Sequence, residues 1–188
     1  MVNNFDLINS LLSFENDKQF YFLQILKRRK DNPEMTKDVS VIDNFYIYNS
    51  NDLLLLKDKI INLCTINNAR ACIRLNVRDS EKIALQTLKE VTDCILNKNY
   101  NGVKSAYTSC CGSYPSDKNK KWIIDIDTKE QSFIEEVVDC LYGIKNVLIY
   151  AKVPTKNGVH LITSPFNPHL FKLKIDIHKD NPTILYIP

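Results

Sequence analysis

The chain has 188 residues, of which 44% are apolar, and this is enough to build one sizeable hydrophobic core. Its formal net charge of +3 excludes a surface coated with basic residues, so any binding of nucleic acid must rely on a local basic patch. No run approaches the roughly 20 apolar residues that span a bilayer, and the first residues lack the layout of a signal peptide. We therefore expect one cytoplasmic domain without a membrane anchor.

The first half of the chain alternates predicted strands and helices. Segments rich in β-branched and aromatic residues predict strands at 20–26, 39–48 and 69–77. Leucines and isoleucines at helical spacing predict a helix at 51–63, capped by Ser50 or Asn51, and a second helix at 80–96.

Residues 110–120 are small, polar and turn-forming, and they predict a linker between two halves, 1–109 and 121–188. The second half contains predicted strands and one helix, in the order 122–127, helix 130–141, 147–152, 159–163 and 183–187. A short helix or loop is expected before the last strand. This order is typical of an RNA-recognition-like, or ferredoxin-like, antiparallel sheet. We therefore predict an α+β fold in which an N-terminal α/β unit packs against that sheet.

Six cysteines are present, but only Cys110 and Cys111 are neighbours and no Cys-x-x-C pair occurs. Zinc sites and disulfide frameworks require cysteines or histidines at short, regular spacings. The spacing therefore favours reduced thiols over a zinc module.

The apolar strand 122–127 carries two carboxylates at its end. Strand alternation puts Asp125 and Asp127 on one face, away from the apolar side chains. Neighbouring carboxylates repel each other, and a bound divalent cation relieves the repulsion. Mg²⁺ and Mn²⁺ prefer such oxygen ligands. The pattern favours a metal site, although a strand that ends in solvated acids has the same pattern.

A turn leads from Pro154 into the strand 159–163, and His160 is the second residue of that strand. Gly158 permits unusual backbone angles or the close approach of a ligand, and a histidine beside such a turn is well placed to contact a phosphate. The alternative is a half-buried histidine without a ligand. Its distance after the Asp pair favours the phosphate contact.

Two basic segments lie in the first half. In the segment 69–78, strand alternation separates an apolar face from a polar face made of Arg70, Arg74, Asn76 and Arg78. Arginines in such a row bind anionic ligands bidentately, or they form an ordinary exposed strand face. The densest basic run, from Lys27 to Lys30, fits either the backbone of a nucleic acid or a solvated turn. No role is predicted for His169 and His178, which we expect at the surface.

Together these motifs resemble those of the archaeo-eukaryotic primase superfamily, which includes primase-polymerases of plasmids and phages. That family has an apolar strand ending in Asp-x-Asp or Asp-x-Glu, a small-residue turn ending in x-His, and an apolar residue followed by Asp. Asp125 and Asp127 match the first motif, and the segment from Thr155 to His160 is similar to the second. Asp176, which follows Ile175, is similar to the third. The resemblance covers roughly residues 69–188.

The resemblance implies a nucleotidyltransferase of DNA replication, which joins nucleoside triphosphates to a 3′-hydroxyl on a DNA or RNA template or primer. Asp125, Asp127 and Asp176 would hold two divalent cations, Mg²⁺ or Mn²⁺, which activate the hydroxyl and neutralise charge on the phosphates. His160 would contact those phosphates. The other candidate nucleotide-binding residues are Thr155, Lys156, Asn157, Gly158, Arg74 and Arg78.

Asp180 competes with Asp176 for the third carboxylate position, but the Asn181-Pro182 pair that follows it is typical of a turn. We expect a side chain in such a turn to bind nearby backbone amides. The source would be a bacterium or a phage-infected cell, and a helicase or accessory replication subunit could supply further functions.

Two other classes of function remain open. A metal-dependent nuclease or phosphodiesterase would use the same carboxylates, with His160 as general acid or base. A nucleic-acid-binding module without catalysis is the third interpretation, because 188 residues are few for a complete primase.

Overall fold

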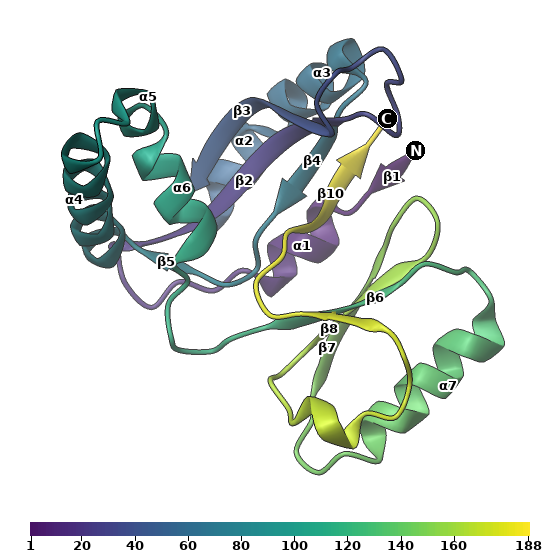
Figure 1. Ribbon diagram of the computed structural model, residues 1–188. Coiled ribbons are helices and arrows are strands. Elements are labelled where there is room, and N and C mark those ends of the chain that lie inside the picture. The colour runs from purple at the N-terminus through teal and green to yellow at the C-terminus, as the bar shows by residue number, and fades with distance from the viewer.

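Two antiparallel sheets form the framework of the computed structural model, which describes residues 1–188 (Figure 1). The predicted α+β fold is confirmed, and seven α-helices accompany the two sheets. No helix combines the length and the apolar character that crossing a membrane requires.

The first sheet is built from six strands, and five of them follow one another by hydrogen bonding in the order β1-β10-β4-β2-β3. The sixth, β5, pairs with the beginning of β2. Their bounds are β1 Val2–Asn3, β2 Gln19–Arg28, β3 Val39–Ile47, β4 Arg70–Ile73, β5 Arg78–Asp79 and β10 Thr183–Ile187.

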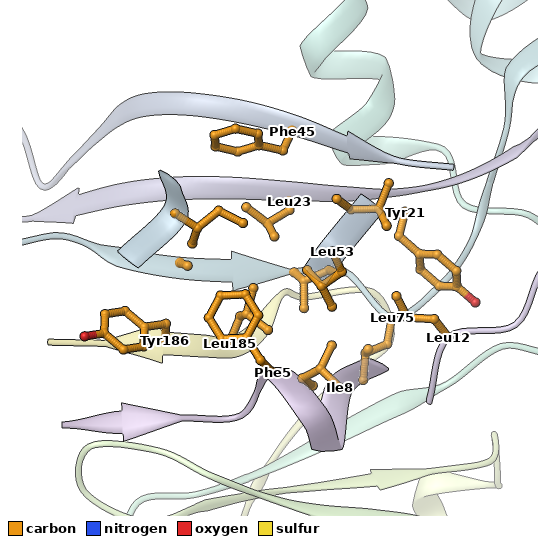
Figure 2. Packing of buried hydrophobic residues seen from close by; sticks show 14 of the residues in the cluster. Phe5, Ile8, Leu12, Tyr21, Leu23, Phe45, Leu53, Leu75, Leu185 and Tyr186 are labelled. Atoms are coloured by element: carbon orange, nitrogen blue, oxygen red, sulfur yellow. The ribbon is translucent and has the colours of Figure 1, made fainter. Parts of the chain in front are cut away.

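Helices cover most of this sheet. Alternate residues of β2 point to opposite faces of the sheet. Tyr21, Leu23 and Ile25 pack on α1, α2 and α3. Phe20 and Phe22 pack on α4 and α6. Figure 2 shows the first of these cores, where Phe5 and Ile8 of α1 lie near Leu185 of β10, and Leu53 of α2 lies between them and Leu23 of β2. The helices are α1 Phe5–Leu11, α2 Ser50–Leu55, α3 Lys57–Asn67, α4 Ser80–Leu96, α5 Tyr100–Val103 and α6 Ala106–Ser113.

The second sheet has the strand order β7-β8-β6-β9. Its strands are β6 Trp122–Ile126, β7 Ile149–Pro154, β8 Val159–Thr163 and β9 Asp176–His178, accompanied by α7 Gln131–Tyr142 and the 3₁₀ turn η1 Pro168–Leu170. Ile124, Ile126 and Leu161 pack on α7, whereas Ile123 and Ile162 join the core of the first sheet. One face of the second sheet therefore rests on α7, and the opposite face is turned toward the first sheet.

The last strand does not lie where the sequence predicted it. We expected residues 183–187 to complete the second sheet, but β10 lies between β1 and β4 in the first sheet, and β9 holds the expected position. All five residues of β10 are buried, which suits a central strand covered on both sides, whereas β9 is partly exposed and suits an edge. The predicted division into 1–109 and 121–188 is therefore wrong at its end, because the chain returns to the first sheet.

Three further predictions in the first half need correction. The strand predicted at 69–77 ends at Ile73, because the polar side chains after it turn inward to bind Asp180. The helix predicted at 51–63 is divided at Leu56, and its cap is Asn49, which forms a capping box with Asp52. The linker starts after Ser113, because Cys110 and Cys111 are buried in α6 against Phe20 and Phe22. Small residues at 110–113 predict a turn, but they fit a buried helix face equally well, and here they form the end of α6.

Other predicted elements agree with the structure within about two residues, among them the helix 80–96 and the strands 20–26, 39–48, 122–127 and 159–163. The six thiols are all free, and five of them are buried.

Candidate functional site

A cavity of about 410 Å³ lies between the two sheets, and we call it the central cavity. The first sheet contributes a wall from β2, β4 and β10 that includes Leu26, Arg28, Arg70, Cys72 and Ile184. The second sheet contributes the opposite wall, which includes Ile123, Asp125, Asp127, His160 and His178. The volume lies within the range of about 300 to 1,000 Å³ that is common for small-molecule sites.

The carboxylates of Asp125 and Asp127 share one face of β6 and line the central cavity, as strand alternation predicts. Ile124 and Ile126 point the other way and pack on α7. Asp125 is half-buried and Asp127 is exposed at the rim. The apolar partners of β6 thus fix the strand, and its acids are left to face the cavity.

His160 lies directly beside Asp125, because β8 pairs with β6 and the two residues are opposite each other in the register. Its Nε2 atom is 3.3 Å from Asp125 Oδ1. This hydrogen bond holds the pKa of the Asp125 carboxyl below its ordinary value, although partial burial works in the opposite direction. His178 and Lys30 lower the same pKa through their charge. The carboxylate of Asp125 is therefore ionised at neutral pH.

His178 is a site residue that sequence reasoning missed. It lies on β9 beside β6, lines the central cavity, and has its Nε2 atom 4.0 Å from Asp125 Oδ2. The expectation of a surface histidine is wrong, because β9 was not predicted as a strand. A hint was present in the sequence, since His178 and Asp176 alternate with apolar Ile175 and Ile177.

The turn between β7 and β8 packs against the end of β6. Thr155 and Gly158 close this turn with two hydrogen bonds, one to the Thr155 hydroxyl and one between backbone groups. A Cβ atom on Gly158 would lie 1.8 Å from the carbonyl oxygen of Ile126, so only glycine fits. The sequence predicted unusual backbone angles or the approach of a ligand at Gly158, whereas the structure shows no positive φ there and a close approach to the backbone of β6. Thr155, Lys156 and Asn157 line the central cavity, but Gly158 does not.

Alternate side chains of the basic run from Lys27 to Lys30 have different surroundings. Lys27 forms an ion pair with Glu34, and Arg29 forms one with Asp38. The other two basic residues line the central cavity and form no ion pair: Arg28 and Lys30. Burial, and then the charges of Arg28 and Arg70, lower the pKa of Lys30. A local excess of positive charge therefore faces Asp125 and Asp127.

The arginines predicted as an anion-binding row are instead committed to ion pairs within the protein. Arg70 makes a bidentate contact with Asp31, at 2.7 and 2.8 Å, and Lys156 binds the same carboxylate at 2.9 Å. Arg78 is fully buried and bonds both oxygens of Asp180. Neither Arg74 nor Arg78 lines the central cavity. The prediction of an exposed basic face is wrong, because the strand ends at Ile73 and the later side chains fold into the protein.

The two candidates for the third carboxylate differ in environment. Asp176 lies opposite Asp125 in the pairing of β9 with β6, but it is exposed and does not line the central cavity. Asp180 accepts hydrogen bonds from Arg78 and Asn76. Its side chain thus binds side chains of the first half, and not the neighbouring backbone amides that were expected.

The donor set of the central cavity suits a hard divalent cation. Asp125 is ionised, Asp127 lies beside it on the same face, and oxygen ligands of this kind are those that Mg²⁺ and Mn²⁺ prefer. No group of three or more acidic, histidine or cysteine side chains is gathered closely enough to hold a metal ion by itself. Mg²⁺ commonly keeps several waters and takes ligands from a substrate phosphate, so two carboxylates are a sufficient protein contribution.

No family model, curated protein or solved structure matches this chain. Its function is therefore inferred from the residues of the central cavity.

Proposed function

We propose that this protein is a metal-dependent nucleotidyltransferase of the primase or primase-polymerase type, which joins nucleoside triphosphates to a 3′-hydroxyl. One observation carries the proposal. The central cavity sets Asp125 and Asp127, on one wall, opposite two cations without ion-pair partners, Arg28 and Lys30. A nucleoside triphosphate requires carboxylates that hold its metal ions and cationic side chains that bind its phosphates, and this cavity has both on facing walls.

The acidic wall would hold Mg²⁺ or Mn²⁺ through Asp125 and Asp127, with Asp176 as the third ligand. The bound cations would make the attacking hydroxyl more acidic and offset the charge that develops on the phosphates. Asp176 is exposed and lies opposite Asp125 in the register of β9 with β6, so the two side chains share one face of the sheet.

The basic wall would bind the phosphates. Arg28 offers a planar guanidinium that can contact two phosphate oxygens at once, and Lys30 offers a mobile ammonium at the rim. His160, which lies beside Asp125 on the wall from the second sheet, would donate a hydrogen bond to a phosphate oxygen. The side chains of Thr155, Lys156 and Asn157 border the same space.

The second sheet supports the resemblance to the archaeo-eukaryotic primase superfamily. Its order β7-β8-β6-β9, with α7 between β6 and β7, is that of an RNA-recognition-like sheet in which η1 stands in place of the second helix. The Asp pair lies on β6, the first strand of this unit. The partners implied are nucleoside triphosphates and a DNA or RNA template or primer, with a helicase or accessory replication subunit as a further candidate.

Primer extension with nucleoside triphosphates and Mn²⁺ tests the proposal. We expect Asp125→Asn, Asp127→Asn and Asp176→Asn each to lower the rate at least about a hundredfold, since losing a metal ligand costs roughly 3 kcal/mol or more of transition-state stabilisation. Asp139→Asn, which removes an exposed carboxylate of α7, is the matched control and should retain the parent rate.

Asp180→Asn separates structure from catalysis in the same assay. It breaks the contact with buried Arg78, so the melting temperature should fall while extension persists at low temperature. Shortening of the primer without nucleoside triphosphates would instead identify a nuclease. Binding of nucleic acid without either reaction would identify a non-catalytic module.

A further inference from the structure

Helix α4 carries a row of apolar side chains that faces solvent. Its inner face is buried at Ile83 and Cys94, and Ile83 packs on the aromatic side chains of β2. Four large aliphatic residues lie elsewhere on the helix and are more than half exposed, namely Leu85 at 57%, Leu88 at 65%, Ile95 at 52% and Leu96 at 74%. Single exposed apolar residues are ordinary on a protein surface, but several on one helix indicate an interaction surface.

The spacing of these four residues makes them one continuous surface, which we call the α4 stripe. Positions 85, 88, 92 and 95 follow the three- and four-residue steps that place side chains on one side of an α-helix, and Thr92 is the polar residue among them. Leu96 extends the stripe, since it follows Thr92 by four residues. Figure 1 shows α4 at the edge of the molecule, away from the second sheet, so a partner can bind the stripe without covering the central cavity.

We propose that the α4 stripe is a dimerisation surface, which binds the same helix of a second copy of this chain in the antiparallel direction. A symmetric dimer needs a surface that is complementary to itself, because every contact between the two copies occurs twice. The α4 stripe meets this condition through its apolar residues and through the charges beside them. Such a dimer would form whatever reaction the central cavity performs.

The charged residues beside the stripe determine the direction of the pair. Lys89 and Asp93 are exposed, and they lie one turn apart on the same edge of the stripe. Val91 is at the middle of the stripe's length, with Lys89 two residues before it and Asp93 two residues after it. A two-fold axis at this level, between antiparallel helices, sets Lys89 of each copy opposite Asp93 of the other. The aliphatic residues of the stripe then face those of the other copy.

A parallel pair of helices lacks this match. It would set Lys89 against Ala84 of the other copy, on the opposite edge of the stripe, and would leave Asp93 without a charged partner. The charge pattern therefore fits a second copy in the antiparallel direction.

Sedimentation velocity of the full chain over a range of concentrations tests the dimer. Two helices about 25 Å long form an interface near the lower limit of about 1,200 Å² for specific complexes, so we expect a dissociation constant of about 1 to 100 µM. Leu88→Glu should raise this constant at least about a hundredfold, because it places a charge in the apolar centre of the interface. Leu55→Glu is the matched control: it adds the same charge at an exposed leucine of α2 and should dimerise as the parent does.

A charge exchange tests the antiparallel direction in the same measurement. Lys89→Glu and Asp93→Lys should each raise the dissociation constant about three- to tenfold, because like charges then face each other at two symmetric positions. The double variant, which carries both changes, restores opposite charges and should dimerise about as well as the parent. All of the substituted side chains are exposed in the single chain, so circular dichroism and the melting temperature should remain those of the parent.

A parent that stays monomeric at about 200 µM would overturn the inference and would indicate that the stripe binds a different protein. A dimer that Leu88→Glu leaves intact would show that the copies meet through another surface. Failure of the double variant to recover the affinity lost in Lys89→Glu and Asp93→Lys would exclude the antiparallel arrangement. Primer extension measures the proposed function separately, since none of these residues lines the central cavity.

Discussion

Arg28 and Lys30 show how single residues gain a role from their direction alone. They alternate with Lys27 and Arg29, which form ion pairs away from the central cavity. All four have similar chemistry and adjacent positions in the sequence. Lys27 and Arg29 already form ion pairs with carboxylates of the protein, whereas Arg28 and Lys30 do not.

This difference leads to a prediction about nucleotide affinity. Arg28→Gln and Lys30→Gln should each weaken binding of Mg²⁺-nucleoside triphosphate, because each removes a charge-assisted contact worth about 1.5 to 3 kcal/mol, or roughly ten- to a hundredfold in affinity. Calorimetry at constant ionic strength measures the effect. Lys27→Gln and Arg29→Gln change the net charge equally and should bind as the parent does. Equal losses in all four variants would indicate only a general electrostatic effect.

At the scale of elements, the turn between β7 and β8 and the end of β6 act as one unit. Gly158 lets this turn lie against the backbone of Ile126 and Thr128, on either side of Asp127 in the sequence. The backbone angles of this glycine are ordinary, since no glycine of the chain has a positive φ. Glycine is required here because there is no room for a side chain. A larger residue would have to displace the backbone of the turn or the backbone at the end of β6.

We therefore predict that Gly158→Ala destabilises the protein by at least about 2 kcal/mol, the cost of forcing a methyl group into a filled space. It should also weaken the binding of Mn²⁺, because any shift of β6 moves Asp127. Urea denaturation and calorimetry measure the two effects. Gly143→Ala is the control: its added Cβ would meet the nearest atom, Cys140 O, at an ordinary 3.4 Å. A urea midpoint and a Mn²⁺ affinity for Gly158→Ala that match those of the parent would contradict the close packing of Gly158 on β6.

At the scale of the whole molecule, ion pairs join segments that are far apart in the sequence. Asp31, just after β2, binds Arg70 at the start of β4 and Lys156 in the turn of the second sheet. Asp180, near the C-terminus, binds Arg78 of β5. Breaking a buried pair by removing one partner typically costs about 3 to 5 kcal/mol, because the other charge is left uncompensated.

The Asp31 cluster predicts a specific dependence of stability on pH. The hydrogen bond from Arg70, and then that from Lys156, lower the pKa of Asp31 from 3.8 to about 2. Because the folded-state pKa is depressed, the unfolded chain binds more protons between these values, so this contribution is complete above about pH 4 and is lost as the pH falls toward 2.

Urea denaturation of the parent and of Asp31→Asn between pH 5 and pH 2.5 tests this. The free energy of unfolding should differ between the parent and Asp31→Asn by a constant amount near pH 5. The difference should become smaller toward pH 2.5, with a total change of about 2 kcal/mol over the full titration of Asp31. Asp17→Asn, which changes an exposed carboxylate, is the control. A gap that stays constant down to pH 2.5 would contradict the low pKa of Asp31.

The sequence by itself determined the features that depend on neighbouring residues. Alternation along 122–127 put Asp125 and Asp127 on one face, and helical spacing gave the bounds of α4, because both periods follow from local backbone geometry. Only the tertiary structure decided which sheet takes β10, that His178 lines the central cavity, and that Arg28 faces the acids while Arg78 is buried on Asp180. Strand pairing and ion-pair partners join residues distant in the chain, and they depend on how all the buried surfaces fit together.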